Sequence, residues 1–211
     1  MAKFDLKVAL RDVYSARQGV FTLIEVPPIH YLAVDGEGDP DTSPDYAAAV
    51  EALFSLSYSV KFASKATGRD FTVGPLEGLW RADDLGAFLR REKAAWRWTM
   101  LIAQPDWITE QQLADASEAS RKKGKGTPHL ERVQLVTLSE GLCAQILHVG
   151  SYDDEGPTLA RLHDEFLPQE GLVPRGDHHE VYLSDPRRAA PEKLKTLLRQ
   201  PVERSADVRA S

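Results

Sequence analysis

Apolar residues occur along the chain in short runs that turn-forming residues separate. Val20–Ile24 and Ile29–Val34 are apolar and flank Pro27-Pro28, which predicts two extended segments around a turn. Asp35–Pro44 is rich in Gly, Pro and Asp and predicts a loop. Apolar residues then recur at helical spacing, so we expect a helix from Pro44 to about Ser64.

The middle of the chain combines strand and helix patterns. We expect strands over Phe71–Trp80 and Ala95–Ala103, because large side chains alternate with polar ones in the second segment. Between them, Asp83-Asp84 predicts a turn, and Leu85–Lys93 is either a short helix or part of the connection. Thr109 and Gln112 form a capping box, which predicts a helix to about Lys123.

The order of elements then begins again. The expected elements are strands at Val133–Leu138 and Leu142–Val149, a helix at Pro157–Leu167, a strand at His179–Ser184, and a short helix at Ala190–Leu198 with Pro191 near its start. The polar residues 201–211 predict a frayed tail. Val34 matches Ile146 and Gly38 matches Gly150 in register, so we predict two repeats with a boundary near Gly124–Pro128. The fold class is therefore α+β.

Composition restricts the class of protein. The chain has 211 residues, 42% hydrophobic and 27% charged, with a net charge of −6, which argues against a general nucleic-acid binder. The basic run 121–125 suits a solvated helix end better than a nucleic-acid patch. A single cysteine, Cys143, fits a reducing compartment and a core position. Without a signal peptide or membrane-spanning run, we expect a cytoplasmic location.

Four segments carry a family resemblance: Val73–Trp80, Trp98–Pro105, His148–Tyr152 and His178–Pro186. They resemble the GyrI-like small-molecule-binding proteins, and the resemblance runs from Val20 to Arg188. The resemblance implies a tandem SHS2 fold, in which two pseudo-symmetric repeats of antiparallel sheet plus helix form a central ligand groove. The expected organisation is an N-terminal extension at 1–19, a domain at 20–200 with repeats at about 20–123 and 130–200, and a disordered tail at 201–211.

The resemblance also implies a function. The Trp-rich segments are similar to the clade that hydrolyses cyclopropanoids, which are DNA-alkylating natural products with a cyclopropane ring. Two alternatives stay open: a non-catalytic sink or sensor for hydrophobic, cationic aromatic compounds, and a gyrase-interacting inhibitor. Regulators with this domain carry a helix-turn-helix segment ahead of it, and fewer than twenty residues precede the first expected strand here. We therefore expect a self-contained enzyme or drug binder, with gyrase the less favoured partner.

Glu180 and Tyr182 are the expected catalytic residues. Strand alternation puts both side chains on one face. If that face is the groove, burial raises the pKa of Glu180, and the carboxylate can act as a general base on water. Tyr182 can orient that water or donate a proton to a developing oxyanion. The alternatives are a Glu180 that faces solvent on an edge strand and a Tyr182 that belongs to the core.

Aromatic residues and methionine are the candidate ligand contacts. Trp80, Trp98 and Met100 are expected pocket walls, because flat or cationic ligands favour aromatic faces. Tyr58 and Phe62 lie one turn apart on the first long helix and are expected to close the groove. For each of these residues, ordinary core packing is the competing interpretation. Trp96 is a weaker candidate, and Trp107 is either a lid or a surface anchor.

We expect neither a metal nor a cofactor. In His178-His179-Glu180, neighbouring side chains point to opposite faces, and the H-E-x-x-H pattern is absent. The segment 124–127 lacks the Walker spacing of a phosphate loop, and the chain contains no G-x-S-x-G elbow.

Overall fold

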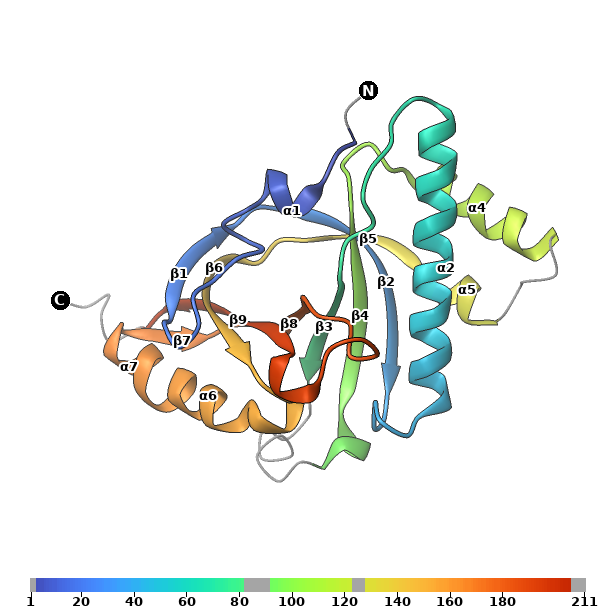
Figure 1. Ribbon diagram of the computed structural model, residues 1–211. Helices are drawn as coiled ribbons and strands as arrows, with labels where there is room; N and C mark the ends of the chain where they lie inside the picture. The colour runs from blue at the N-terminus through green and yellow to red at the C-terminus, as the bar shows by residue number, and fades with distance from the viewer. Residues whose placement is uncertain (1–2, 82–91, 123–127, 206–211) are drawn as a thin grey trace. The chain divides into compact units, whose positions relative to one another are not determined.

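The computed structural model describes residues 3–81, 92–122 and 128–205. The chain forms two compact units, each built from two pieces. The N-terminal unit combines Met1–Leu10 with Pro28–Leu138, and the C-terminal unit combines Arg11–Pro27 with Ser139–Ser211. Each unit contains a set of antiparallel strands and a main helix (Figure 1). The predicted α+β class is confirmed.

The sheet of the N-terminal unit has the strand order β3-β4-β2-β5, with antiparallel pairing throughout. Its strands are β2 (Ile29–Glu37), β3 (Leu76–Arg81), β4 (Arg97–Gln104) and β5 (Gln134–Leu138). Its helices are α1 (Leu6–Ala9), α2 (Pro44–Ala66), α4 (Glu110–Lys122) and α5 (Pro128–Arg132), with a 3₁₀ turn η1 at Lys93–Ala95.

Local signals explain the two long helices of this unit. Ser43 caps α2 by accepting a hydrogen bond from the Tyr46 amide at 3.3 Å, and Pro44 occupies the first turn. At the start of α4, the Thr109 amide donates to Gln112 Oε1 at 2.9 Å and the Gln112 amide donates to Thr109 Oγ1 at 3.3 Å. This reciprocal pair confirms the predicted capping box. Helix α2 packs against β2 and β4 and buries Leu53, Leu56 and Val60 there.

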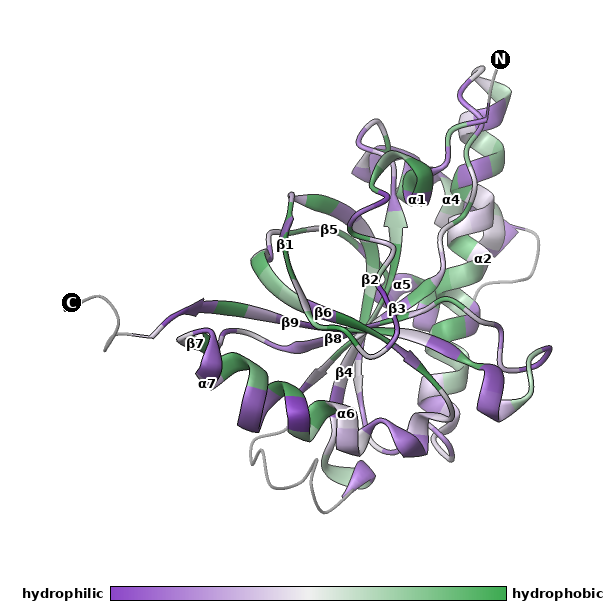
Figure 2. Ribbon diagram, turned by 60° about the vertical axis from the view of Figure 1, so that its left-hand side comes forward, coloured by the Kyte–Doolittle hydropathy of each residue, from purple (hydrophilic) through white to green (hydrophobic). Residues whose placement is uncertain are grey.

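The sheet of the C-terminal unit has the strand order β1-β6-β9-β8, and β7 pairs with the far end of β9. Its strands are β1 (Thr22–Val26), β6 (Gly141–Val149), β7 (Leu172–Pro174), β8 (His178–Tyr182) and β9 (Lys195–Arg204). Its helical segments are η2 (Tyr152–Asp154), α6 (Gly156–Arg161), the π-helical turn η3 (Leu162–Phe166), α7 (Leu167–Gln169) and η4 (Pro191–Lys193). Figure 2 shows β6 as a mainly hydrophobic strand.

The order of elements is similar in the two units: β2, α2, β3 and β4 in one, and β6, a helical segment, β8 and β9 in the other, where the short β7 precedes β8. Gly38 follows β2 and Gly150 follows β6, with φ of 96° and 153°. In the N-terminal unit, Gly78 and Val34 flank Met100 in register. In the C-terminal unit, Glu180 and Ile146 flank Leu198 in the same way. Glu180 therefore occupies the position on β8 that Gly78 occupies on β3.

In the chain, the outer strand of each unit directly precedes a strand of the other unit. Strand β1 precedes β2 directly in the chain, yet β1 pairs with β6 of the C-terminal unit. Likewise, β5 directly precedes β6 but pairs with β2 of the N-terminal unit. The two predicted strand-turn-strand segments therefore exist as strands, and the members of each segment belong to different units.

The predicted helix at Ala190–Leu198 is wrong. Only Pro191–Lys193 is helical, as a 3₁₀ turn, and β9 begins at Lys195. Strand β9 pairs with β6 and β8 along its two edges, and residues 196–202 are all buried, so both of its faces are covered and the strand lacks the alternation of a half-exposed strand. β9 extends to Arg204, which places a strand within the segment expected to be a tail. Residues 206–211, the turn at Asp83-Asp84 and most of the 85–93 segment lie outside the described residues.

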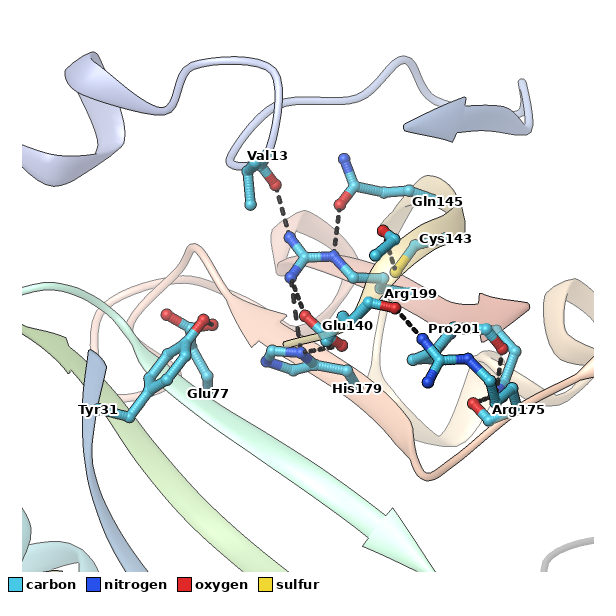
Figure 3. Close-up of polar contacts among 12 residues, drawn as sticks. Val13, Tyr31, Glu77, Glu140, Cys143, Gln145, Arg175, His179, Arg199 and Pro201 are labelled. Carbon is cyan, nitrogen blue, oxygen red and sulfur yellow. Dashed lines mark hydrogen bonds and ion pairs between the residues drawn. The ribbon is translucent and has the colours of Figure 1, made fainter. Parts of the chain in front are cut away.

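A buried polar network fixes the segment before β1 to the C-terminal sheet (Figure 3). The fully buried Arg199 guanidinium donates to Gln145 Oε1 at 2.9 Å, to Glu140 Oε2 at 3.0 Å and to the Val13 carbonyl at 2.6 Å. His179 Nδ1 lies 2.9 Å from Glu140 Oε1. Burial alone would raise the pKa of Glu140, but the adjoining His179 and Arg199 lower it to about 2. The network therefore holds a carboxylate whose charge is balanced.

Among the helices of the described residues, none has the length and hydrophobicity needed to cross a bilayer.

Candidate functional site

Glu180 and Tyr182 lie on β8 and share one face of the sheet. Tyr182 Oη donates a hydrogen bond to Glu180 Oε2 at 2.8 Å, and the Glu180 side chain is 13% exposed. Within the described residues, no hydrogen-bond donor reaches the other carboxyl oxygen, Oε1. The pair thus presents one oxygen that a tyrosine orients and one that is open to a further donor.

Burial raises the pKa of Glu180 from its ordinary value of 4.5 to about 7. The Tyr182 hydrogen bond and the nearby His179 oppose this shift without cancelling it. A carboxyl group with a pKa near neutrality can take a proton from water and give it back within the same pH range. This property distinguishes Glu180 from a surface glutamate and favours an acid–base role.

Three further side chains belong to the surroundings of Glu180. His178 shares its face, with His178 Nε2 at 3.6 Å from Glu180 Oε1. Tyr152 contacts the Tyr182 ring edge-on, with ring centroids 5.5 Å apart, and its pKa is raised to about 12 by burial and by the charges of Glu155 and Glu180. Thr196 stands opposite Tyr182 in the β8–β9 register.

Sequence reasoning did not select these three residues. His178 was considered only as a metal ligand, although its position two residues before Glu180 was the available signal for a shared face. Tyr152 lies in the His148–Tyr152 segment that contributed to the family resemblance. No sequence signal pointed to Thr196, because its place depends on the strand register.

The predicted pocket walls Trp80, Trp98 and Met100 gather in the N-terminal unit, on the sheet face that α2 covers. Tyr46 of α2 contacts Trp98 edge-on at 5.1 Å and stacks on Trp80 at 6.5 Å. Trp98 and Met100 are fully buried, and Trp80 is 6% exposed. Trp96 adds an edge contact to Trp80 at 5.6 Å. These side chains form an aromatic cluster that packs as part of the core of this unit.

Two glycines make room for this aromatic cluster. A Cβ atom on Gly36 would lie 2.0 Å from the Trp98 ring, because the indole covers the backbone of its register partner. A Cβ atom on Gly78 would lie 2.9 Å from Trp80 Nε1 and 3.3 Å from Met100 Cε. The large rings and the missing side chains are therefore complementary.

Tyr58 and Phe62 lie on the exposed side of α2. Their side chains are 49% and 58% exposed, and the two rings stack with centroids 6.4 Å apart. Lys61 Nζ lies 4.5 Å from the Phe62 ring centroid. Trp107 is tied down instead, because Nε1 donates to Ser64 Oγ at 3.1 Å and the ring contacts Phe4 at 5.1 Å. Trp107 thus anchors its loop within the N-terminal unit.

A separate cavity of about 240 Å³ lies on the opposite face of the N-terminal sheet. Leu79, Thr99 and Leu101 line it, and these residues alternate along their strands with Trp80, Trp98 and Met100. Arg81 Nη2 contacts Asp35 Oδ1 at 3.5 Å, and Arg132 Nη1 contacts Asp45 Oδ1 at 2.8 Å at its rim. The cavity therefore does not belong to the aromatic cluster.

Cys143 is buried, as predicted, and burial raises the pKa of its thiol to about 12. The group is therefore a neutral thiol at ordinary pH. The described parts of the chain contain no group of three or more His, Cys, Asp or Glu side chains that could hold a metal ion.

Comparisons with known proteins find one family model and several similar structures. Residues 20–203 match the family model described as the GyrI-like small molecule binding domain. A hydrolase from Listeria innocua is similar in structure, with 40% sequence identity and a TM-score of 0.83 over 95% of this chain and 100% of the other. An uncharacterized conserved protein from Listeria innocua has 39% identity and a TM-score of 0.86 over 95% of this chain and 100% of the other.

A more distant structure shares the fold alone. The C-terminal domain of EcmrR has 12% identity and a TM-score of 0.57, over 88% of this chain and 98% of that domain. The search of curated proteins found no match.

Proposed function

Because the chain belongs to the GyrI-like small-molecule-binding domain family, we propose that it is a cofactor-independent hydrolase that opens the cyclopropane ring of cyclopropanoid DNA-alkylating natural products. The observation that carries this proposal is the Glu180 carboxyl group, which burial gives a pKa of about 7. The similar hydrolase from Listeria innocua, at 40% identity, supports the reaction class.

The proposed reaction is the addition of one water molecule. Glu180 Oε1 removes a proton from water while the water oxygen bonds to a carbon of the strained ring. The ring carbon–carbon bond breaks, and its electron pair moves to a conjugated oxygen of the substrate, which takes up a proton from solvent. Glu180 then releases its own proton to solvent. Because ring strain supplies the driving force, orientation of the water and a well-placed base are sufficient.

Tyr182 holds Glu180 in place for this step. Its hydroxyl donates to Oε2, so the open oxygen Oε1 is the one that accepts the proton. Loss of this bond would free the carboxyl group to rotate, and Oε1 would then no longer have a fixed position. We assign Tyr182 the role of orienting the base, with a second capacity to stabilise negative charge that develops on the substrate.

We also propose Trp80, Trp98, Met100, Tyr58 and Phe62 as ligand contacts in the N-terminal unit. Tyr58 and Phe62 offer exposed ring faces to a flat aromatic compound. Trp98 and Met100 are enclosed, so a ligand reaches them only after neighbouring side chains move. Substitution of Phe62 by alanine should therefore weaken ligand binding with little loss of stability, whereas Trp98→Ala should destabilise the unit.

The second candidate is a protein that binds hydrophobic, cationic aromatic compounds without turnover. Glu180 would then serve as the counter-charge, and a bound cation would lower its pKa. The Lys61 ammonium beside Phe62 disfavours a cation at that particular ring. A gyrase-interacting inhibitor is the third candidate, and recovery of no gyrase subunit in a pull-down would argue against it.

Mass spectrometry of the chain incubated with a cyclopropanoid tests the proposal. We expect a product heavier by one water from the native chain, and bound but unconverted substrate with Glu180→Gln. Glu192→Gln, an exposed acid of the same unit, is the matched control and should retain full turnover. Equal turnover by Glu180→Gln would contradict the catalytic role, and tight binding without product from the native chain would favour the second candidate.

A pH profile adds an independent test. The base must be ionised, so kcat should rise with pH through about 7 and level off above it. A kcat that is flat between pH 5 and 9 would exclude Glu180 as the base.

A further inference from the structure

His178 has two ring nitrogens that are buried and lack a hydrogen-bond partner among the described residues. Buried polar groups without partners are rare in folded proteins, and such groups commonly mark a site for a bound water or ligand. The imidazole belongs to the same strand face as Glu180, and its side chain is 13% exposed. It is therefore a polar group that the core packing leaves unsatisfied.

The imidazole is neutral. Burial is the main cause that lowers the pKa of His178 to about 3, and the charges of His163 and His179 act in the same direction, against the opposite effect of Glu140. A neutral imidazole offers one N–H donor and one nitrogen lone pair. An ion pair with Glu180 is accordingly not formed at ordinary pH.

The distance between the two groups suits one intervening water molecule. His178 Nε2 and Glu180 Oε1 are 3.6 Å apart, which is too long for a direct hydrogen bond. A water about 2.8 Å from each atom would bridge this gap and would satisfy both groups. Since Tyr182 occupies Oε2, Oε1 is the oxygen that remains for such a water.

We propose that His178 is a second catalytic residue, which together with Glu180 holds and orients the water that attacks the substrate. This inference rests on the proposed hydrolase function. In the reactive arrangement the water donates one hydrogen to Glu180 Oε1 and the other to His178 Nε2, with the ring proton on Nδ1. Both lone pairs of the water oxygen then face away from the protein acceptors, toward the substrate carbon.

The bond changes remain those of one water addition. The hydrogen on Oε1 transfers to Glu180 as the carbon–oxygen bond forms, and the hydrogen on Nε2 stays with the oxygen as the product hydroxyl. His178 neither gains nor loses a proton. Its contribution is to fix the direction of attack, which is an effect on kcat rather than on substrate affinity.

Three substitutions separate this role from a structural one. Gln places its amide near the position of Nε2, Asn places its amide near Nδ1, and Leu supplies neither. With a cyclopropanoid as substrate, we expect His178→Leu and His178→Asn to lower kcat about 100-fold, and His178→Gln to retain roughly a tenth of native kcat, with KM changed less than about threefold.

Two results would overturn the proposal: native kcat in His178→Leu, or an equal loss in all three variants accompanied by a matching loss of thermal stability. His163→Gln, which changes an exposed imidazole near His178, is the control and should keep native kcat.

A crystal structure of the native chain at high resolution gives a readout that does not depend on turnover. We expect an ordered water within hydrogen-bond distance of both Nε2 and Oε1, and its loss in His178→Leu. If the native chain fails to open the ring while this water is present, the hydrolase function fails and the water site stands. If the ring opens but no water lies between the two atoms, the role of His178 is refuted and the hydrolase function stands.

Discussion

The charge of Glu180 should cost the protein stability, and replacement of this residue by glutamine should recover it. The pKa of Glu180 rises from 4.5 to about 7 because burial penalises the ionised form. The folded state therefore binds a proton more tightly than the unfolded chain does. The resulting stability is fully present below pH 4.5 and is lost as the pH rises through 7.

The magnitude follows from the size of the shift. A difference of about 2.5 pKa units, at 1.36 kcal/mol each, corresponds to about 3 kcal/mol lost between pH 4.5 and pH values above 7. Glutamine stays neutral throughout, and its carbonyl can still accept the hydrogen bond from Tyr182. Glu180→Gln should thus match the native chain near pH 4.5 and exceed it by up to about 3 kcal/mol at pH 8.5.

Urea unfolding at pH 4.5 and pH 8.5 measures this difference directly. For a chain of this length, a gain of 3 kcal/mol also corresponds to a rise in Tm of about 6–12 °C at pH 8.5. Glu192→Gln, which removes an exposed acid, should show no comparable dependence on pH. The buried-charge reasoning would be refuted if the difference in unfolding free energy between Glu180→Gln and the native chain were the same at both pH values. It would also be refuted if the variant were less stable than the native chain at pH 8.5.

Three further predictions concern the two units. Glu140→Gln should destabilise the C-terminal unit by about 3–5 kcal/mol at pH 7, because Arg199 would be left buried without its anionic partner, and urea unfolding would detect this loss. Unchanged stability would contradict the importance of the network. Gly36→Ala should cost about 1–3 kcal/mol or more through the clash with Trp98, whereas Gly156→Ala, with no atom near its added Cβ, should be nearly neutral in the same thermal melt. Trp107→Phe should lower the free energy of unfolding by about 1 kcal/mol, because the hydrogen bond to Ser64 is lost. If Trp107→Phe lowered it more than Trp107→Ala does, the anchoring role of the ring would be contradicted.

Local sequence signals predicted the elements that local interactions stabilise. The capping box of Thr109 and Gln112 and the start of α2 at Pro44 are contained within a few residues. The shared face of Glu180 and Tyr182 followed from alternation alone. In each case, the information needed for the prediction lies within one element.

Tertiary context decided what the sequence could not predict. The β9 segment failed as a helix prediction because a strand covered on both faces shows no alternation. The pKa of Glu180 depends on burial that other elements supply, and the proximity of Thr196 depends on strand register. The enclosed position of Trp98 against Tyr46 likewise required the packing of α2 on the sheet.

The exchanged outer strands restrict how this chain can be divided. A cut near residue 139 would give a C-terminal fragment with an uncovered β6 edge, and without the Val13 carbonyl that accepts a hydrogen bond from Arg199. The matching N-terminal fragment would carry β1 with no sheet to join. We therefore expect neither piece to fold as an autonomous module, because each piece lacks a strand that the other piece carries.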